Sequence, residues 1–177
     1  RIFNADGVAT EILKRVYRLM SSDGVSRYCR SRLQADPDSP VANLTMFHLA
    51  RIQEDYEGAV GYIDKCVALS GSDTEGGLES LLKKAHLLTV AHKKTSDKRY
   101  LEGAIAVYES LAARMPKNSS VLNNLAYMLA QGDQQLAVAE RYARQALADD
   151  PDSAVYLDTC AYVLYKAGKT AEAARVM

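Results

Sequence analysis

The sequence predicts an all-α fold, a solenoid of about five helix-turn-helix repeats, and a repeated figure in the second half of the chain carries this prediction. Residues 123–151 form a pattern of two short helices, joined by a polar break at 131–135 and ended by Pro151. The same figure starts again at Leu157. Because one helical hairpin cannot bury its apolar face alone, repeated hairpins must stack to share a continuous core.

Two ladders of inward positions run along the whole chain. One ladder has spacings of 34, 45, 35 and 34 residues and consists of Val25, Ala59, Ala104, Ala139 and Ala173. The other has spacings of 34, 38, 41 and 35 residues and consists of Leu13, Phe47, Ala85, Ala126 and Ala161. The ladders agree if four extra residues precede the third unit, seven lie between its helices and one lies inside the fourth.

These landmarks resemble the tetratricopeptide repeat family, whose period is 34 residues and whose units keep small residues at the eighth and twentieth positions. The best match is the Asn-Asn-Leu-Ala-Tyr-Met-Leu stretch at 123–129. The resemblance implies a right-handed α-solenoid that forms one domain over residues 1–177. Its expected repeats are 6–39, 40–73, 78–118, 119–153 and a partial repeat at 154–177.

The first two units are weaker matches, because Leu13, Phe47 and Val25 replace small residues. In the first unit, a turn is expected at 21–24, between two helices. The second unit begins at Ser39-Pro40, where a serine N-cap precedes a proline at the first helical position.

Two insertions distinguish the third unit. Residues 71–77 contain three glycines and predict a flexible loop, with a hinge as the alternative. The seven extra residues lie within 92–99 and predict a longer first helix or a longer turn after it. Pro116 ends the second helix of this unit.

The composition excludes several classes of protein. The chain has 22 basic and 22 acidic residues and no formal net charge, so a nucleic-acid partner is not expected. Its apolar runs are shorter than the roughly 18 residues of a membrane-spanning helix. The sequence starts at Arg1, so a targeting segment can precede it, and both the cytoplasm and the bacterial periplasm stay open as compartments.

No pattern typical of catalysis appears. Phosphate-binding glycine loops, nucleophile elbows and paired zinc histidines are absent, so we expect neither enzymatic activity nor a cofactor. His86 and His92 lie about 120° apart on a helix, which argues against a metal pair. Cys29, Cys66 and Cys160 fall at inward positions and are expected to be free, small apolar residues.

The candidate binding residues follow from the resemblance, because the first helices of the family line a concave groove. The chain has eleven tyrosines but only two phenylalanines, and tyrosine suits such a surface. For the asparagines among the candidates, simple solvation of a helix start is an equal alternative. The positions that the resemblance places in the groove are His48, Arg51, Lys83, His86, Asn123, Asn124, Tyr127, Tyr162 and Tyr165.

Two specific binding modes of the family are incomplete here. Lys83 and Asn124 fit a carboxylate clamp, but the remaining members are missing. Asn124 also fits an asparagine ladder, whereas Thr45 and Thr159 stand at equivalent positions. The basic run at 93–99 is interpreted as a solvated loop, with a small contact for an acidic ligand as the alternative.

The predicted function is therefore a non-catalytic scaffold that binds a peptide or protein segment in its groove. One alternative is a regulatory or recruiting repeat arm of a larger enzyme or of a bacterial envelope or export assembly. Another is self-association, with a homodimer formed through the partial C-terminal repeat. In that case Leu164, Ala174 and Met177 should be partly exposed or covered by a second copy.

Overall fold

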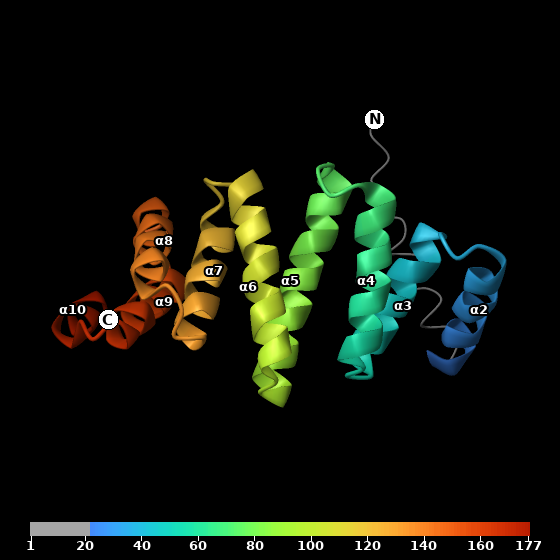
Figure 1. Ribbon diagram of the computed structural model, residues 1–177, viewed down its shortest axis with the longest axis horizontal. Helices are drawn as coiled ribbons and strands as arrows, with labels where there is room; N and C mark the ends of the chain where they lie inside the picture. The colour runs from blue at the N-terminus through green and yellow to red at the C-terminus, as the bar shows by residue number, and fades with distance from the viewer. Residues whose placement is uncertain (1–21) are drawn as a thin grey trace. The chain divides into compact units, whose positions relative to one another are not determined.

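The computed structural model describes residues 22–177, which form nine α-helices and no strand (Figure 1). The predicted all-α helical-repeat fold class is thus confirmed. The helices belong to two compact units, unit 1 over residues 1–83 and unit 2 over residues 84–177. The division falls inside one long helix, α5 (Glu75–Thr95). The first helix of the first expected repeat lies outside the described residues.

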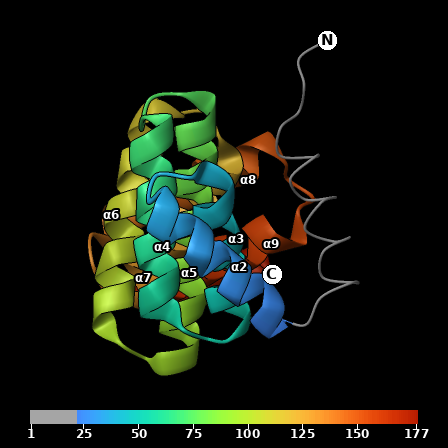
Figure 2. The ribbon, with the colours of Figure 1, turned by 90° about the vertical axis from the view of Figure 1, so that its right-hand side faces the viewer.

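The described part of unit 1 contains α2 (Ser22–Ala35), α3 (Pro40–Ile52), α4 (Tyr56–Ser70) and the start of α5. Helix α3 packs against α4 on one side and against α2 on the other (Figure 2). A buried cluster of Val25, Cys29, Met46 and Leu49 joins α2 to α3, with Leu33 and Tyr62 packed against it. The unit therefore has its own small hydrophobic core.

The sequence signals at the ends of α3 and α4 are largely borne out. Ser39 is the N-cap of α3 and Pro40 opens the helix, although the serine side chain makes no capping hydrogen bond. Asp55 caps α4, since its carboxylate accepts a hydrogen bond from the Gly58 N–H at 2.9 Å. The turn expected at 21–24 is wrong from Ser22 onward, where the chain is already helical.

Helix α5 differs from the sequence prediction at its start and agrees with it at its end. It begins at Glu75, so Gly76 and Gly77 lie in its first turn and not in a loop. At the other end it continues to Thr95, which makes it 21 residues long. The extra residues of the third repeat therefore lengthen the helix, as the sequence indicates.

Unit 2 contains the rest of α5 followed by α6 (Lys98–Arg114), α7 (Ser119–Gln131), α8 (Leu136–Asp149), α9 (Ala154–Lys166) and α10 (Thr170–Val176). Helices α7 and α8 form one hairpin, and α9 and α10 form the next. Helix α9 also packs against both α7 and α8. Asp97 and Asn118 cap α6 and α7 through side-chain oxygens that accept backbone N–H groups.

The two ladders of inward positions are buried wherever the structure describes them. In unit 2 the exposed fraction is 0 % for Ala85, Ala104, Ala126 and Ala139. The larger residues of unit 1 are also buried, with Phe47 and Val25 each 2 % exposed. Bulky residues at these two positions are therefore accommodated in the core and do not face solvent. Leu13 lies outside the described residues.

The last hairpin is more enclosed than the sequence predicts at one position. Leu164 is fully buried, because α9 is covered by α7, α8 and α10. Its predicted exposure is therefore wrong. Ala174 is exposed, and Met177 is 83 % exposed.

Ion pairs connect α8 to the α9–α10 hairpin. The Glu140 carboxylate accepts hydrogen bonds from Lys169 Nζ at 2.8 and 2.9 Å and from Arg144 Nε at 3.0 Å. Arg144 also reaches Glu172 on α10 at 2.6 Å. The hydrogen bond from Lys169, followed by that from Arg144, lowers the pKa of Glu140.

This network predicts a pH-dependent contribution to stability. A carboxylate whose pKa is lowered by folding stabilises the protein above the unfolded pKa of about 4.3, and this stabilisation is lost as the pH falls through the folded pKa. Glu140→Gln should therefore lower the free energy of unfolding by about 0.5–1 kcal/mol at pH 7. The deficit relative to wild type should shrink below about pH 4.

Urea denaturation at several pH values measures this difference. Glu109→Gln is the matched control, because Glu109 is exposed on α6 and has no ion pair within residues 22–177. That variant should stay close to wild type at each pH. A deficit for Glu140→Gln that persists unchanged to pH 3 would contradict the assignment.

Candidate functional site

In unit 1 the structure brings three predicted residues together, His48, Arg51 and Lys83. The His48 ring is half-buried on α3 and meets the Phe47 ring edge-on, with centroids 5.0 Å apart. Burial, and then the positive charges of Arg51 and Lys83, lower the pKa of His48. The imidazole is thereby kept neutral, so it can accept a hydrogen bond as well as donate one. Lys83 itself pairs with Glu79 one turn earlier on α5.

In unit 2 the predicted tyrosines come from the first helices of successive hairpins. Tyr127 on α7 and Tyr162 on α9 have ring centroids 5.6 Å apart and planes tilted by 42°. Burial is the main cause that raises the pKa of Tyr162, so its hydroxyl stays protonated and can donate. Tyr165, one turn further along α9, is 61 % exposed. The three rings present both apolar area and hydroxyl groups along α7 and α9.

The two asparagines of α7 have different surroundings. Asn123 is 3 % exposed, and its Oδ1 has no hydrogen-bond partner among the described residues. The structure thus corrects the expectation that Asn123 lies on the surface of the groove. Asn124 is partly exposed and hydrogen-bonds with the hydroxyl of the buried Tyr108 on α6.

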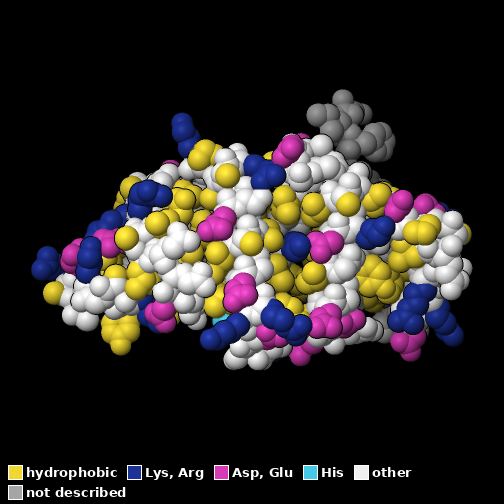
Figure 3. Space-filling view, in the orientation of Figure 1, with side chains coloured by type: hydrophobic (Ala, Val, Ile, Leu, Met, Phe, Trp, Pro, Cys, Tyr) yellow, Lys and Arg dark blue, Asp and Glu magenta, His cyan; other side chains and the backbone are white. Residues whose placement is uncertain are grey.

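His86 is the predicted residue that the structure leaves apart from the tyrosines. It is exposed on α5, and no described contact joins it to Tyr127 or Tyr162. The face shown in Figure 3 carries acidic and basic side chains interspersed with hydrophobic ones.

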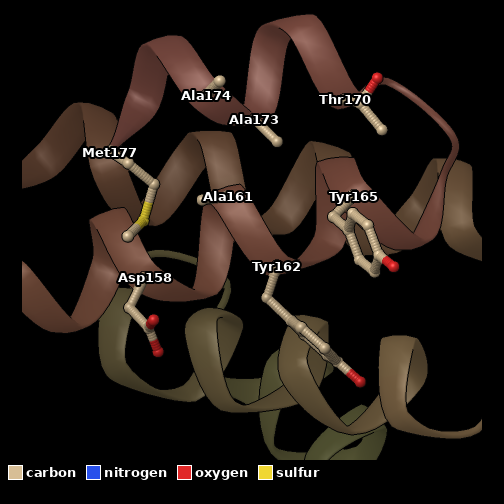
Figure 4. Close-up of a pocket in the computed structure, with 8 residues that line it drawn as sticks. All are labelled: Asp158, Ala161, Tyr162, Tyr165, Thr170, Ala173, Ala174 and Met177. Atoms are coloured by element: carbon tan, nitrogen blue, oxygen red, sulfur yellow. The ribbon is translucent and has the colours of Figure 1, made fainter.

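Two hollows adjoin the tyrosines. The first has a volume of about 380 Å³ on the α9–α10 hairpin, where Tyr162 and Tyr165 project from α9 (Figure 4). The second has a volume of about 220 Å³ at the C-terminal end of α5, beside α7. Residues that line the first are Asp158, Ala161, Tyr162, Tyr165, Thr170, Ala173, Ala174 and Met177. Residues that line the second are Thr89, His92, Lys93, Ser96, Tyr127, Met128 and Gln131.

Sequence reasoning missed Gln131 as a neighbour of Tyr127. Its Nε2 donates a hydrogen bond to the Tyr127 hydroxyl oxygen at 3.0 Å. The available signal was its spacing, because residues four apart on a helix lie on the same face. Ser96 was harder to find, since its place depends on where α5 ends.

The cysteines behave as the sequence predicts. Cys29, Cys66 and Cys160 are free and buried, and burial raises the pKa of each thiol. Among residues 22–177, no group of three or more His, Cys, Asp or Glu side chains is arranged to hold a metal ion. Within the same residues, no helix is both long and apolar enough to span a membrane.

Comparisons with known proteins identify the fold. No family model and no curated protein matches the chain. Among solved structures, MamA from residue 41 to its end, from Desulfovibrio magneticus RS-1, matches with a TM-score of 0.72 and 19 % identity. This match covers 99 % of the present chain and 93 % of that one.

Two further MamA structures agree with this match. The MamA RS-1 ArsTM double mutant gives a TM-score of 0.72 and 18 % identity, over 99 % of this chain and 92 % of that one. Another MamA crystal structure gives 0.70 and 15 %, over 96 % and 86 % of the two chains. At these identities the likeness establishes the fold alone, and this chain therefore has the helical fold of MamA.

Proposed function

We propose that this chain is a non-catalytic protein-interaction module of the tetratricopeptide repeat type, and that unit 2 binds an extended protein segment along α7 and α9. The contact between Tyr127 and Tyr162 carries the proposal, because it joins aromatic side chains of successive hairpins into one surface. Tyrosine supplies contact area together with a hydroxyl group. Asn124 adds an amide that can pair with a peptide backbone.

The exposure of the tyrosines fits this role. Tyr165 is 61 % exposed, although aromatic side chains are usually more buried. Large aromatic residues are also enriched among the residues that dominate interface energies. In unit 1 we assign His48, Arg51 and Lys83 to a second contact surface, and in unit 2 exposed His86 is a further candidate. Asn123 is omitted, because its side chain is buried.

The test uses a partner isolated by pull-down from cells that make the protein, followed by calorimetry with the purified partner segment. Tyr162→Ala combined with Tyr165→Ala should weaken binding at least about tenfold, since interface aromatics often contribute more than 1–2 kcal/mol. Circular dichroism should show that the double variant stays helical.

Tyr28→Ala is a matched control for the exposed tyrosine. Tyr28 lies on α2 and is 62 % exposed, so this variant loses a similarly exposed ring away from the proposed surface. Its affinity should equal that of wild type. Unchanged binding by the double variant would remove α9 from the binding surface.

Self-association is a second candidate function, and the hollow on the α9–α10 hairpin favours it. The hollow exposes Tyr165 and Met177, whose side chains are 61 % and 83 % exposed. Light scattering of the same samples separates the two candidates. A dimer that dissociates in Tyr165→Ala would support self-association, whereas a monomer at every concentration that still binds its partner would support the first candidate alone.

A further inference from the structure

We infer that the hollow between the end of α5 and α7 is a subsite for one acidic side chain of the bound segment. This inference rests on the proposed function, since it assigns a specificity pocket beside the tyrosine surface. The hollow has a volume of about 220 Å³, below the roughly 300–1,000 Å³ typical of small-molecule sites. It can therefore take a single side chain of a ligand but not a cofactor.

The charge of the lining favours an anion. Lys93 lines the hollow and has no ion-pair partner within residues 22–177. The nearest acidic group in sequence, Asp97, is already engaged, because its carboxylate accepts hydrogen bonds from Arg99 Nε at 3.0 Å and Nη2 at 2.8 Å. The Lys93 ammonium is thus left to attract a negatively charged ligand group.

Hydrogen-bond donors add direction to this charge. The Tyr127 hydroxyl accepts from Gln131, so its own hydrogen is free to donate to a ligand. His92 Nδ1 lies 3.1 Å from the Asp97 carbonyl oxygen. A carbonyl oxygen only accepts, so this contact places the proton on Nδ1 and fixes the orientation of the ring. Ser96 contributes one more hydroxyl group.

The remaining lining suits the apolar part of a glutamate. Met128 and the ring of Tyr127 line the hollow from α7 and can pack against methylene groups. The basic and hydroxyl groups come from the end of α5. An aspartate or glutamate side chain would therefore place its carboxylate near Lys93 and Tyr127, with its methylene groups against α7.

The extension of α5 supplies this half of the hollow. His92, Lys93 and Ser96 all belong to the inserted segment at 92–99, which lengthens the helix relative to a standard repeat. Lys83 and Asn124, the two positions that partly fit a carboxylate clamp, do not line the hollow. The subsite is therefore a feature of this insertion and is not produced by the repeat pattern.

The test is a titration of ¹⁵N-labelled protein with N-acetylglutamate amide, which carries the side chain without a free terminus. We expect chemical-shift changes at the amides of Lys93, Ser96 and Gln131. N-acetylglutamine amide, the same shape without the charge, should bind about three- to fivefold more weakly, as the loss of one exposed ion pair predicts.

Lys93→Gln should weaken binding of the glutamate probe by about the same factor. Lys94→Gln is the matched control, because it removes the same charge one residue away from a side chain that does not line the hollow. Tyr127→Phe keeps the ring, removes the hydroxyl and should also weaken the glutamate probe. Retention of full affinity in Lys93→Gln would overturn the subsite.

Two further outcomes would also overturn it. One is equal binding of the glutamate and glutamine probes. The other is tighter binding of N-acetylalanine, whose carboxylate is a chain terminus, because the site would then recognise a C-terminus and not a side chain. These outcomes are distinct from failure of the proposed function: there the Tyr162→Ala and Tyr165→Ala variant retains partner binding while the glutamate probe still binds at Lys93.

Discussion

Gly77→Ala should lower the free energy of unfolding by about 3 kcal/mol, at the upper end of the cost of overpacking. A Cβ atom on Gly77 would lie 1.9 Å from the Gly71 carbonyl oxygen and 3.1 Å from the Ser72 Cα. These are backbone atoms, so no side-chain rotation can relieve the clash. The first turn of α5 would have to move away from the end of α4.

Local hydrogen bonds oppose that movement. Gly71 ends α4 with φ at 78°, in the left-handed region, and its N–H bonds to the Val67 carbonyl oxygen. The Thr74 hydroxyl oxygen accepts from the Gly77 N–H at 3.0 Å and lies 2.8 Å from the Ser70 carbonyl oxygen. Moving Gly77 would break the bond to Thr74 or distort the cap of α4.

Gly76→Ala provides the control one residue earlier. Its Cβ would meet Ser70 Oγ at 3.6 Å, an ordinary contact, and alanine favours a helix over glycine by about 1 kcal/mol. Urea denaturation should therefore show a stability equal to or above wild type for Gly76→Ala and a large loss for Gly77→Ala. Equal midpoints for the two variants would contradict the close approach of α4 and α5.

The inward ladder explains why the fold class could be predicted from the sequence. Ala126 and Ala139 recur at nearly constant spacing, and a small residue at such a position is required wherever two helices approach closely. Burial of both side chains follows from that requirement. The lengthened α5 was predictable for a similar reason, because seven extra residues without a proline can continue a helix.

Other features depend on tertiary contacts that local sequence does not report. Gly76 and Gly77 predict a loop from their low helix propensity, but the close approach to Gly71 requires glycine inside the first turn of α5. Asn123 is a polar residue that predicts exposure, whereas the packing of α7 with its neighbouring helices buries it. The hollow beside Lys93 exists only because the end of α5 lies beside α7 after folding.

Ala126→Leu should destabilise unit 2 by about 1–3 kcal/mol. Ala126 on α7 is fully buried, as are Ala139 and Ala143 on the partner helix α8. A leucine adds three carbon atoms to an interface built from small side chains, so α7 and α8 must separate or their side chains must leave favourable rotamers.

Ala106→Leu is the matched control for this change. Ala106 is exposed in the middle of α6, so the same three carbon atoms would extend into solvent and should change stability by no more than about 0.5 kcal/mol. Urea denaturation followed by circular dichroism compares the two variants. If Ala126→Leu and Ala106→Leu unfold at the same urea concentration, then α7 and α8 do not approach closely at Ala126, and the spacing of the ladder no longer explains the hairpin.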